Sequence, residues 1–260
     1  MLTRKPVPDT HCEGVTFTVT NIQNLSKAVA LILVQEFQLA RQLAAGLPLS
    51  TTTMMLTSRD IEDIIARRLH PADVYHRDGL LFQLLMWLAS HLDLQGDDLV
   101  ALPHSQGSAK GQDSIIVHRS NSSVVALSIC EDKATENPRD VVRDEVWPEI
   151  LEYESGGRAD ELRSSVIATL GTGGVPTNEA IALIRGISWA GKRRYRVRVT
   201  IEQQPRSPNL FKGFDEIVVG DTVMRRGETL QVESLRSWMS TFSELVESEL
   251  RRLSPGGPHV

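Results

Sequence analysis

The chain has 260 residues, of which 41% are hydrophobic and 23% charged, and its formal net charge is -5. This length suits one large domain or two small ones, and the composition excludes a chain that is disordered, collagen-like or coiled-coil as a whole. The longest apolar run, residues 28–34, is far shorter than the roughly 20 residues that span a bilayer. The N-terminus has no apolar segment typical of a secretory signal, and the two cysteines, Cys12 and Cys130, are too few for a disulfide framework or a thiolate zinc site. We therefore expect a cytoplasmic protein that does not associate with membranes.

The first half of the chain is predicted to be mainly helical. Residues 1–14, which are polar and contain proline, are expected to form a loose arm, and residues 14–20 alternate as a strand does. Helices are predicted over residues 24–45, 58–70 and 79–92. The last of these is apolar on nearly all sides, which indicates a buried central helix.

The second half alternates between strands and helices. Strands are predicted over residues 98–102, 114–117, 124–130, 195–201 and 216–219. Helices are predicted over residues 139–154, 159–170, 178–188 and 233–253. The pattern favours a mixed α/β (α+β) fold. We expect a strand and helical extension over residues 1–75, a second unit over 76–253 and a disordered tail over 254–260.

A hairpin over residues 114–130 brings two carboxylates to one edge of the predicted sheet. Asp113 lies at the start of its first strand and Glu131 at the end of its second. Two carboxylates this close repel each other unless a cation lies between them, and Mg²⁺ or Mn²⁺ prefers such hard oxygen ligands. The main-chain carbonyl of Asp132 would add a further ligand. Lys133 projects to the same side of the strand as Glu131, where it would orient or help deprotonate a water and offset the charge of a phosphorane-like transition state.

Each of these residues also has a non-catalytic interpretation. Glu131 and Lys133 would then form an ion pair at a solvated sheet edge. Asp113 would be a turn residue that caps the loop after Gly111. The surrounding order favours the catalytic interpretation, because an apolar helix and an apolar strand precede the Glu-x-Lys triplet and an amphipathic helix follows it.

Charge is distributed unevenly along the chain. Residues 131–161 contain eleven acids and four bases, whereas residues 185–212 contain eight bases and one acid. The basic residues that lead into or lie on the polar face of the strand at 195–201 are Lys192, Arg193, Arg194, Arg196 and Arg198. Such a row is typical of a strand that contacts the phosphates of DNA. The alternative is an edge strand that positive charge protects against aggregation.

The order of helix, hairpin and helix, with Asp113, Glu131 and Lys133 in a D…ExK pattern, resembles the PD-(D/E)XK nuclease superfamily over roughly residues 79–201. More narrowly, the segments GLLFQLLMWL, KGQDSIIV, SICEDKAT and NLFKGFDEIVV resemble the nuclease subunit of Hachiman-type anti-phage defence. Many members of the superfamily carry an acid on the leading helix, whereas the strongly polar residues of this one are Gln83 and His91.

The resemblance implies a restriction-endonuclease-like sheet flanked by helices. It also implies that Asp113 and Glu131 bind Mg²⁺, that Lys133 assists the nucleophilic water, and that a superfamily 2 helicase partner restrains the nuclease. We therefore predict a metal-dependent DNA endonuclease of a bacterial antiviral defence system. Two alternatives stay open: a non-catalytic subunit that binds a partner protein through the acidic region and the terminal helices, and a sequence-specific restriction enzyme.

Overall fold

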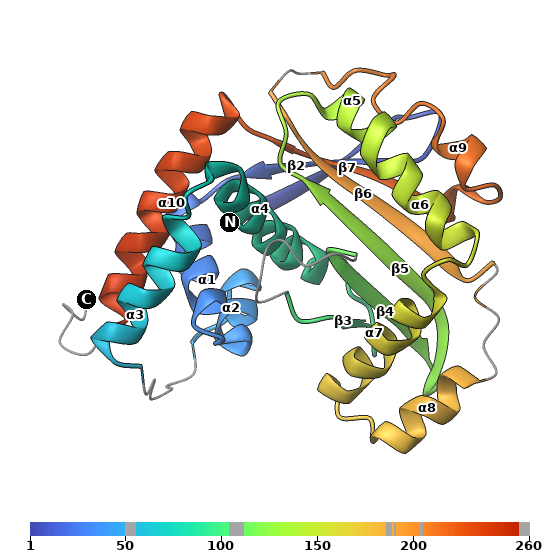
Figure 1. The fold of residues 1–260 in the computed structure, drawn as a ribbon, viewed down its shortest axis with the longest axis horizontal. Helices are drawn as coiled ribbons and strands as arrows, with labels where there is room; N and C mark the ends of the chain where they lie inside the picture. The colour runs from blue at the N-terminus through green and yellow to red at the C-terminus, as the bar shows by residue number, and fades with distance from the viewer. Residues whose placement is uncertain (50–55, 104–111, 186–188, 190, 203–204, 255–260) are drawn as a thin grey trace.

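A seven-stranded mixed sheet, in the order β1-β2-β7-β6-β5-β4-β3, runs through the molecule (Figure 1). The computed structural model describes residues 1–49, 56–103, 112–185, 189, 191–202 and 205–254. The strands are β1 (Leu2–Val7), β2 (Glu13–Val19), β3 (Leu99–Val100), β4 (Ser114–Ser120), β5 (Ser123–Lys133), β6 (Arg193–Ile201) and β7 (Arg225–Gln231). Strands β2, β7, β6 and β5 pair in parallel, whereas β1, β4 and β3 pair antiparallel with their neighbours. The predicted mixed α/β class is confirmed.

Helices cover both faces of this sheet (Figure 1). The first layer contains α1 (Ile22–Leu33), α2 (Phe37–Ala44), α3 (Ser58–Ile64), α4 (Val74–His91) and α10 (Leu235–Arg252). The second layer contains α5 (Pro138–Val141), α6 (Trp147–Glu154), α7 (Ala159–Thr172), α8 (Thr177–Arg185) and α9 (Phe214–Ile217). Shorter helical turns are η1 (Ile65–Leu69), η2 (Val142–Val146) and η3 (Thr222–Met224).

Each layer packs on its own face of the sheet, because successive strand residues point to opposite sides. Ile116 and Cys130 belong to the core beneath the first layer, and Ile115 and Ile129 belong to the core beneath the second. The face to which a strand residue points therefore decides which helices its side chain meets.

The hairpin that carries the predicted site is formed locally. Asn121 and Ser122 connect β4 to β5 and have φ values of 48° and 63°. A two-residue loop with both φ values positive is the turn that matches the twist of paired strands. The expected hairpin is thus present, with strands longer than predicted.

Three sequence-based expectations are corrected by the fold, and one strand was not expected. The N-terminal arm is ordered, because Leu2–Val7 forms β1 on the edge of β2. The helix predicted over residues 24–45 is broken at Gln35, which has a φ of 65°. Residues 214–217 form α9, where a strand was expected over 216–219, and β7 was not predicted. Residues 255–260 of the expected disordered tail, and residues 104–111 before the candidate site, lie outside the described residues.

The expected boundary near residue 75 does not divide the hydrophobic core. Leu25 of the N-terminal segment belongs to the same buried cluster as Leu85 and Phe242, and β2 pairs with β7. In the described part of the chain, none of the helices is both long and apolar enough to cross a membrane.

Candidate active site

The hairpin brings Asp113 and Glu131 to the same edge of the sheet. Ser114 pairs with Cys130, so the residues on either side of this pair, Asp113 and Glu131, are cross-strand neighbours. Glu131 points to the face of the second helical layer, as Lys133 does two residues further along β5. Asp113 precedes β4 and reaches Gln83 on α4, in the first layer. The Oδ2 atom of Asp113 accepts a hydrogen bond of 2.6 Å from the main-chain N–H of Asp132. The three residues of the D…ExK pattern are therefore close together.

Glu131 is buried in an environment that opposes its negative charge. Glu131 is only 2% exposed, and its Oε1 atom has no hydrogen-bond partner among the described residues. Burial raises the pKa of Glu131 well above 4.5, and the nearby carboxylates of Asp113 and Glu149 raise it further. A cation beside Glu131 would remove this penalty.

Asp113 is held by two donors. Gln83, on α4, donates a hydrogen bond from Nε2 to Oδ1, while the N–H of Asp132 contacts Oδ2. Burial raises the pKa of Asp113, although the Asp132 N–H and the charge of Lys133 act to lower it. Gln83 thus connects α4 to the candidate site. It contributes an amide from the leading helix, where many members of the superfamily that the sequence resembles carry an acid.

Lys133 is held by acids from the second helical layer. Its Nζ lies 3.3 Å from Oε1 of Glu149, on α6, and 3.7 Å from Oε2 of Glu145, on η2. Burial lowers the pKa of Lys133, but Glu149, Glu131 and Asp113 outweigh it, so the net shift is upward. Lys133 is consequently an ammonium ion that can donate hydrogen bonds but has no free pair with which to accept a proton.

Sequence reasoning missed Glu149. The signal that could have identified it is its place beside the apolar stripe of Val146, Ile150 and Tyr153, at the border of the buried helix face. A carboxylate at that border contacts side chains of the strand against which the helix packs, and here it contacts Lys133 of β5.

The two adjacent acids of β5 have different surroundings. The Asp132 side chain points to the opposite face from Glu131 and is paired with Arg198, whose Nη2 lies 2.8 Å from Oδ2. Arg198 also donates to the Ser90 hydroxyl at 2.7 Å and to the Met86 carbonyl at 3.1 Å. The Asp132 carboxylate is thus part of the packing beneath α4. Its main-chain carbonyl stays a predicted metal ligand.

The basic residues of β6 are not arranged as expected. The parallel register pairs Glu131 with Val197 and Lys133 with Val199, so Arg196 and Arg198 point away from the candidate site. Arg198 is 0% exposed and Arg196 is 5% exposed. The expectation that these two guanidinium groups hold DNA beside the site is corrected, because strand alternation places them on the other face.

The remaining basic residues have different surroundings. Arg194 pairs with Ser128 of β5, so it also points to the face away from the candidate site, where it was not expected. Arg193 lies 3.0 Å from Glu154 and donates to the Tyr153 carbonyl at 2.7 Å, and Lys192 is partly exposed. The alternative of a protective edge strand does not apply, because β6 lies inside the sheet between β5 and β7.

The donor set fits a magnesium ion held by few protein ligands. Among the described residues, no group of three or more His, Cys, Asp and Glu side chains could hold a metal ion. Mg²⁺ needs fewer, since it keeps several waters and is commonly bound by one or two carboxylates. Asp113 and Glu131 supply two, and Oε1 of Glu131 is a buried oxygen whose lone pairs are not used by a donor among the described residues.

No protein-family model matches this chain, and a comparison with curated proteins finds no match.

Proposed function

We propose that this chain is a Mg²⁺-dependent deoxyribonuclease with a restriction-endonuclease-like core. The observation that carries the proposal is the buried Oε1 of Glu131, which has no hydrogen-bond partner among the described residues and lies next to Asp113 and beside Lys133. The polar neighbours of this buried carboxyl group include two further acids, Asp113 and Glu149, the second of which hydrogen-bonds to it. Such a group costs stability unless a cation accompanies it, which supports a metal ligand here.

Each residue has a separate task in the proposed reaction. Asp113 and Glu131 hold the metal, which when bound would stabilise the charge of the phosphoryl group and favour ionisation of the attacking water. Gln83 and the N–H of Asp132 keep the Asp113 carboxylate in one orientation. Lys133 orients the water and donates to the phosphoryl oxygens as negative charge develops on them. Glu149 keeps the Lys133 ammonium group in place.

The charge balance of the site supports strict dependence on a metal. Asp113, Glu131 and Glu149 surround Lys133, so acids outnumber bases. A DNA phosphate that approached these residues alone would be repelled. A divalent cation reverses the local sign, and we expect no cleavage after chelation by EDTA.

The test is cleavage of supercoiled plasmid, linear duplex and single-stranded DNA with Mg²⁺ or Mn²⁺. Glu131→Gln and Lys133→Met should each lower the rate by about 100-fold or more, since losing one group that stabilises transition-state charge typically costs this much. Glu152→Gln, an exposed acid-to-amide change on the neighbouring helix α6, is the matched control and should cleave like the wild type. Cleavage at the wild-type rate by Glu131→Gln would refute the proposal.

Titration calorimetry separates this proposal from a non-catalytic interaction subunit. A nuclease should bind Mn²⁺ at one site that Asp113→Ala removes, even if the isolated chain does not cleave DNA. A chain that neither cleaves DNA nor binds Mn²⁺ would be the interaction subunit instead.

The restraining helicase and the role in antiviral defence stay predictions of the family resemblance. We propose that a superfamily 2 helicase encoded beside this chain binds it and lowers its activity. Co-expression followed by affinity purification tests this, and failure to co-purify would contradict it.

A further inference from the structure

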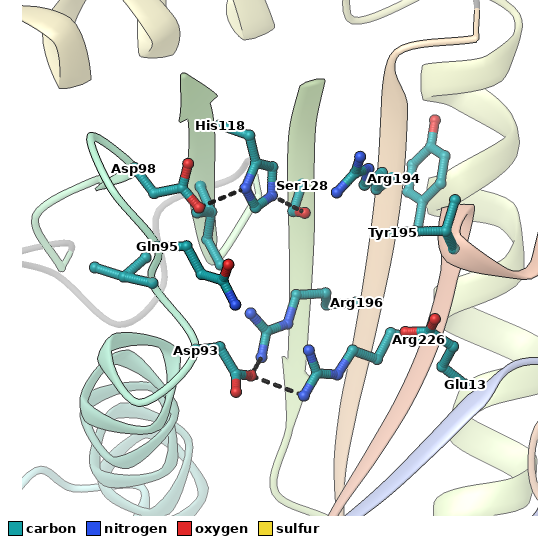
Figure 2. Close-up of a pocket in the computed structure, with 13 residues that line it drawn as sticks. Glu13, Asp93, Gln95, Asp98, His118, Ser128, Arg194, Tyr195, Arg196 and Arg226 are labelled. Carbon is teal, nitrogen blue, oxygen red and sulfur yellow. Dashed lines mark hydrogen bonds and ion pairs between the residues drawn. The ribbon is translucent and has the colours of Figure 1, made fainter. Parts of the chain in front are cut away.

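A polar cavity lies on the face of the sheet opposite the candidate nuclease site. It has a volume of about 260 Å³ and is open to solvent between β6, β5, β4 and the segment that follows α4 (Figure 2). Its polar lining includes Asp98, His118, Ser128, Arg194, Arg196 and Arg226. His118 and Ser128 share this face with Ile116 and Cys130 of the first core.

Three of these side chains form an ordered chain of hydrogen bonds (Figure 2). Oδ2 of Asp98 lies 2.9 Å from Nδ1 of His118, and Nε2 of His118 lies 2.8 Å from Oγ of Ser128. A carboxylate can only accept, so the hydrogen of a neutral ring lies on Nδ1, and Nε2 accepts from the Ser128 hydroxyl. The order of hydroxyl, imidazole and carboxylate is that of a nucleophile, its base and the group that orients the base.

The backbone holds this arrangement in place. The register between β4 and β5 shifts between His118 and Arg119, and such a bulge re-aims a strand side chain. The second oxygen of Asp98 accepts from the main-chain N–H of Arg119 at 3.1 Å. Burial lowers the pKa of His118, Asp98 opposes this shift, and Arg194 and Arg196 add to it. The ring is therefore neutral at pH 7 and able to accept a proton.

The guanidinium group of Arg194 lies beside the Ser128 hydroxyl (Figure 2). The parallel register pairs Ser128 with Arg194, and Figure 2 shows the Arg194 guanidinium next to Ser128. Arg196 and Arg226 are both engaged by Asp93 and Glu228. The Arg194 side chain, in contrast, makes no ion pair or hydrogen bond to any residue that the structure describes. It is free to stabilise negative charge that develops at Ser128.

We propose that Asp98, His118 and Ser128 form a second catalytic centre, which hydrolyses small carboxylic esters. Ser128 Oγ forms a bond to the ester carbonyl carbon while its proton passes to Nε2 of His118, and the resulting oxyanion faces Arg194. The bond to the alcohol oxygen then breaks, and His118 returns the proton to the departing alcohol. Water repeats the sequence on the acyl-Ser128, which releases the acid and restores the hydroxyl.

The cavity sets the class of substrate. Its lining contains three arginines and three acids, the acids being Glu13, Asp93 and Asp98, so its overall charge is balanced. Balanced charge favours an uncharged ester over a polyanion such as DNA. The volume, which is small for a ligand site, favours a short acyl group.

The test uses a short-chain alkyl fluorophosphonate, which reacts when Ser128 Oγ displaces fluoride from phosphorus and the hydroxyl proton passes to His118. Mass spectrometry of the full chain should locate one adduct, on Ser128. Asp98→Asn, which keeps the shape but removes the charge that selects the tautomer, should slow labelling and p-nitrophenyl acetate hydrolysis by 100-fold or more. The matched control is Ser114→Ala, another buried serine of the hairpin, whose hydroxyl has no hydrogen bond among the described residues.

Three outcomes decide the proposal. Labelling of Ser128 that Asp98→Asn slows, with an unchanged melting temperature, supports it. Labelling elsewhere, or no labelling of a folded wild type, overturns it and leaves the three residues as a cross-strand packing network. Glu131→Gln should label at the wild-type rate, so this centre can fail or succeed independently of the nuclease.

Discussion

At the scale of single residues, the neighbouring acids Glu131 and Asp132 show how one strand serves two purposes. Alternation sends Asp132 toward Arg198, which satisfies its carboxylate with a paired guanidinium. The same alternation sends Glu131 into a site where other acids face it and where its Oε1 has no partner in the part of the chain that the structure describes. Local rules of stability are usually broken at functional positions. The contrast places Asp132 in the packing of the core and agrees with the ligand-binding role proposed for Glu131.

We predict that Glu131→Gln makes the metal-free protein more stable. The folded-state pKa of Glu131 lies above its ordinary value of 4.5, so the folded protein binds the proton more tightly than the unfolded chain does. Wild-type stability is consequently lost as the pH rises from about 4.5 through the folded-state pKa, and the amide removes this loss. A gain of about 1 kcal/mol would raise the melting temperature by about 2–4 °C at pH 8.

Differential scanning calorimetry at pH 4 and pH 8, without divalent metal, measures this effect. The gain should be larger at pH 8. Asp132→Asn is the control with the opposite sign, because it leaves Arg198 buried without its partner and should lose about 3 kcal/mol or more. Destabilisation by Glu131→Gln at pH 8 would mean that the carboxylate has a structural role.

At the scale of elements, β7 is a central strand with a polar sequence, RRGETLQ. Its polar groups are satisfied by partners that are distant in sequence: Glu228 contacts Arg196, and the Thr229 hydroxyl lies 2.8 Å from that of Thr16. Gly227 leaves room for the ring of Phe211. Such a strand has no alternation of apolar and polar residues by which the sequence could predict it. Ion pairs and the close approach of backbone at Gly227 allow it to be buried instead.

We predict that Gly227→Ala destabilises the protein by about 1–3 kcal/mol, the usual cost of overpacking a core. A Cβ atom at this position would lie 2.4 Å from Cδ2 of Phe211 and 2.7 Å from Sγ of Cys12. Urea unfolding followed by tryptophan fluorescence measures the loss. Gly171→Ala, in α7 with nothing within 4 Å of the new methyl group, is the control and should be neutral or slightly stabilising. Equal stability of both variants would contradict the packing argument.

At the scale of the whole molecule, the N-terminal segment completes the sheet that carries the candidate site. The β1-β2 hairpin adds to the edge of β7 in parallel through β2. α1 packs against α10 from the other end of the chain. Removing residues 1–75 would expose both the edge of β7 and the apolar surfaces of α4 and α10, which is a route to aggregation.

We predict that residues 76–260 do not fold alone and that co-expression with residues 1–75 restores a soluble complex. Size-exclusion chromatography and circular dichroism on the separate and co-expressed fragments measure this. A cooperative thermal transition of the fragment 76–260 alone would show instead that the N-terminal segment is an independent extension.

The features that the sequence determined by itself are local ones. The hairpin, its turn at Asn121 and Ser122, and the alternation that puts Glu131 and Lys133 on one face all depend on neighbours within about twenty residues. Asp113 meets Glu131 because a hairpin joins the ends of its own strands. The buried helix α4 is also predictable from sequence, because the apolar residues that identify it follow one another in a single segment.

The tertiary structure decided everything that depends on which distant segments pair. The parallel register of β5 and β6 buries Arg196 and Arg198 on the far face, and the packing of α6 and α4 brings Glu149 and Gln83 to the candidate site. The same sheet places Asp98 beside His118 and Ser128. Periodicity shows that a strand has two faces but carries no information about what will cover each of them, because that choice is made by non-local pairing and burial.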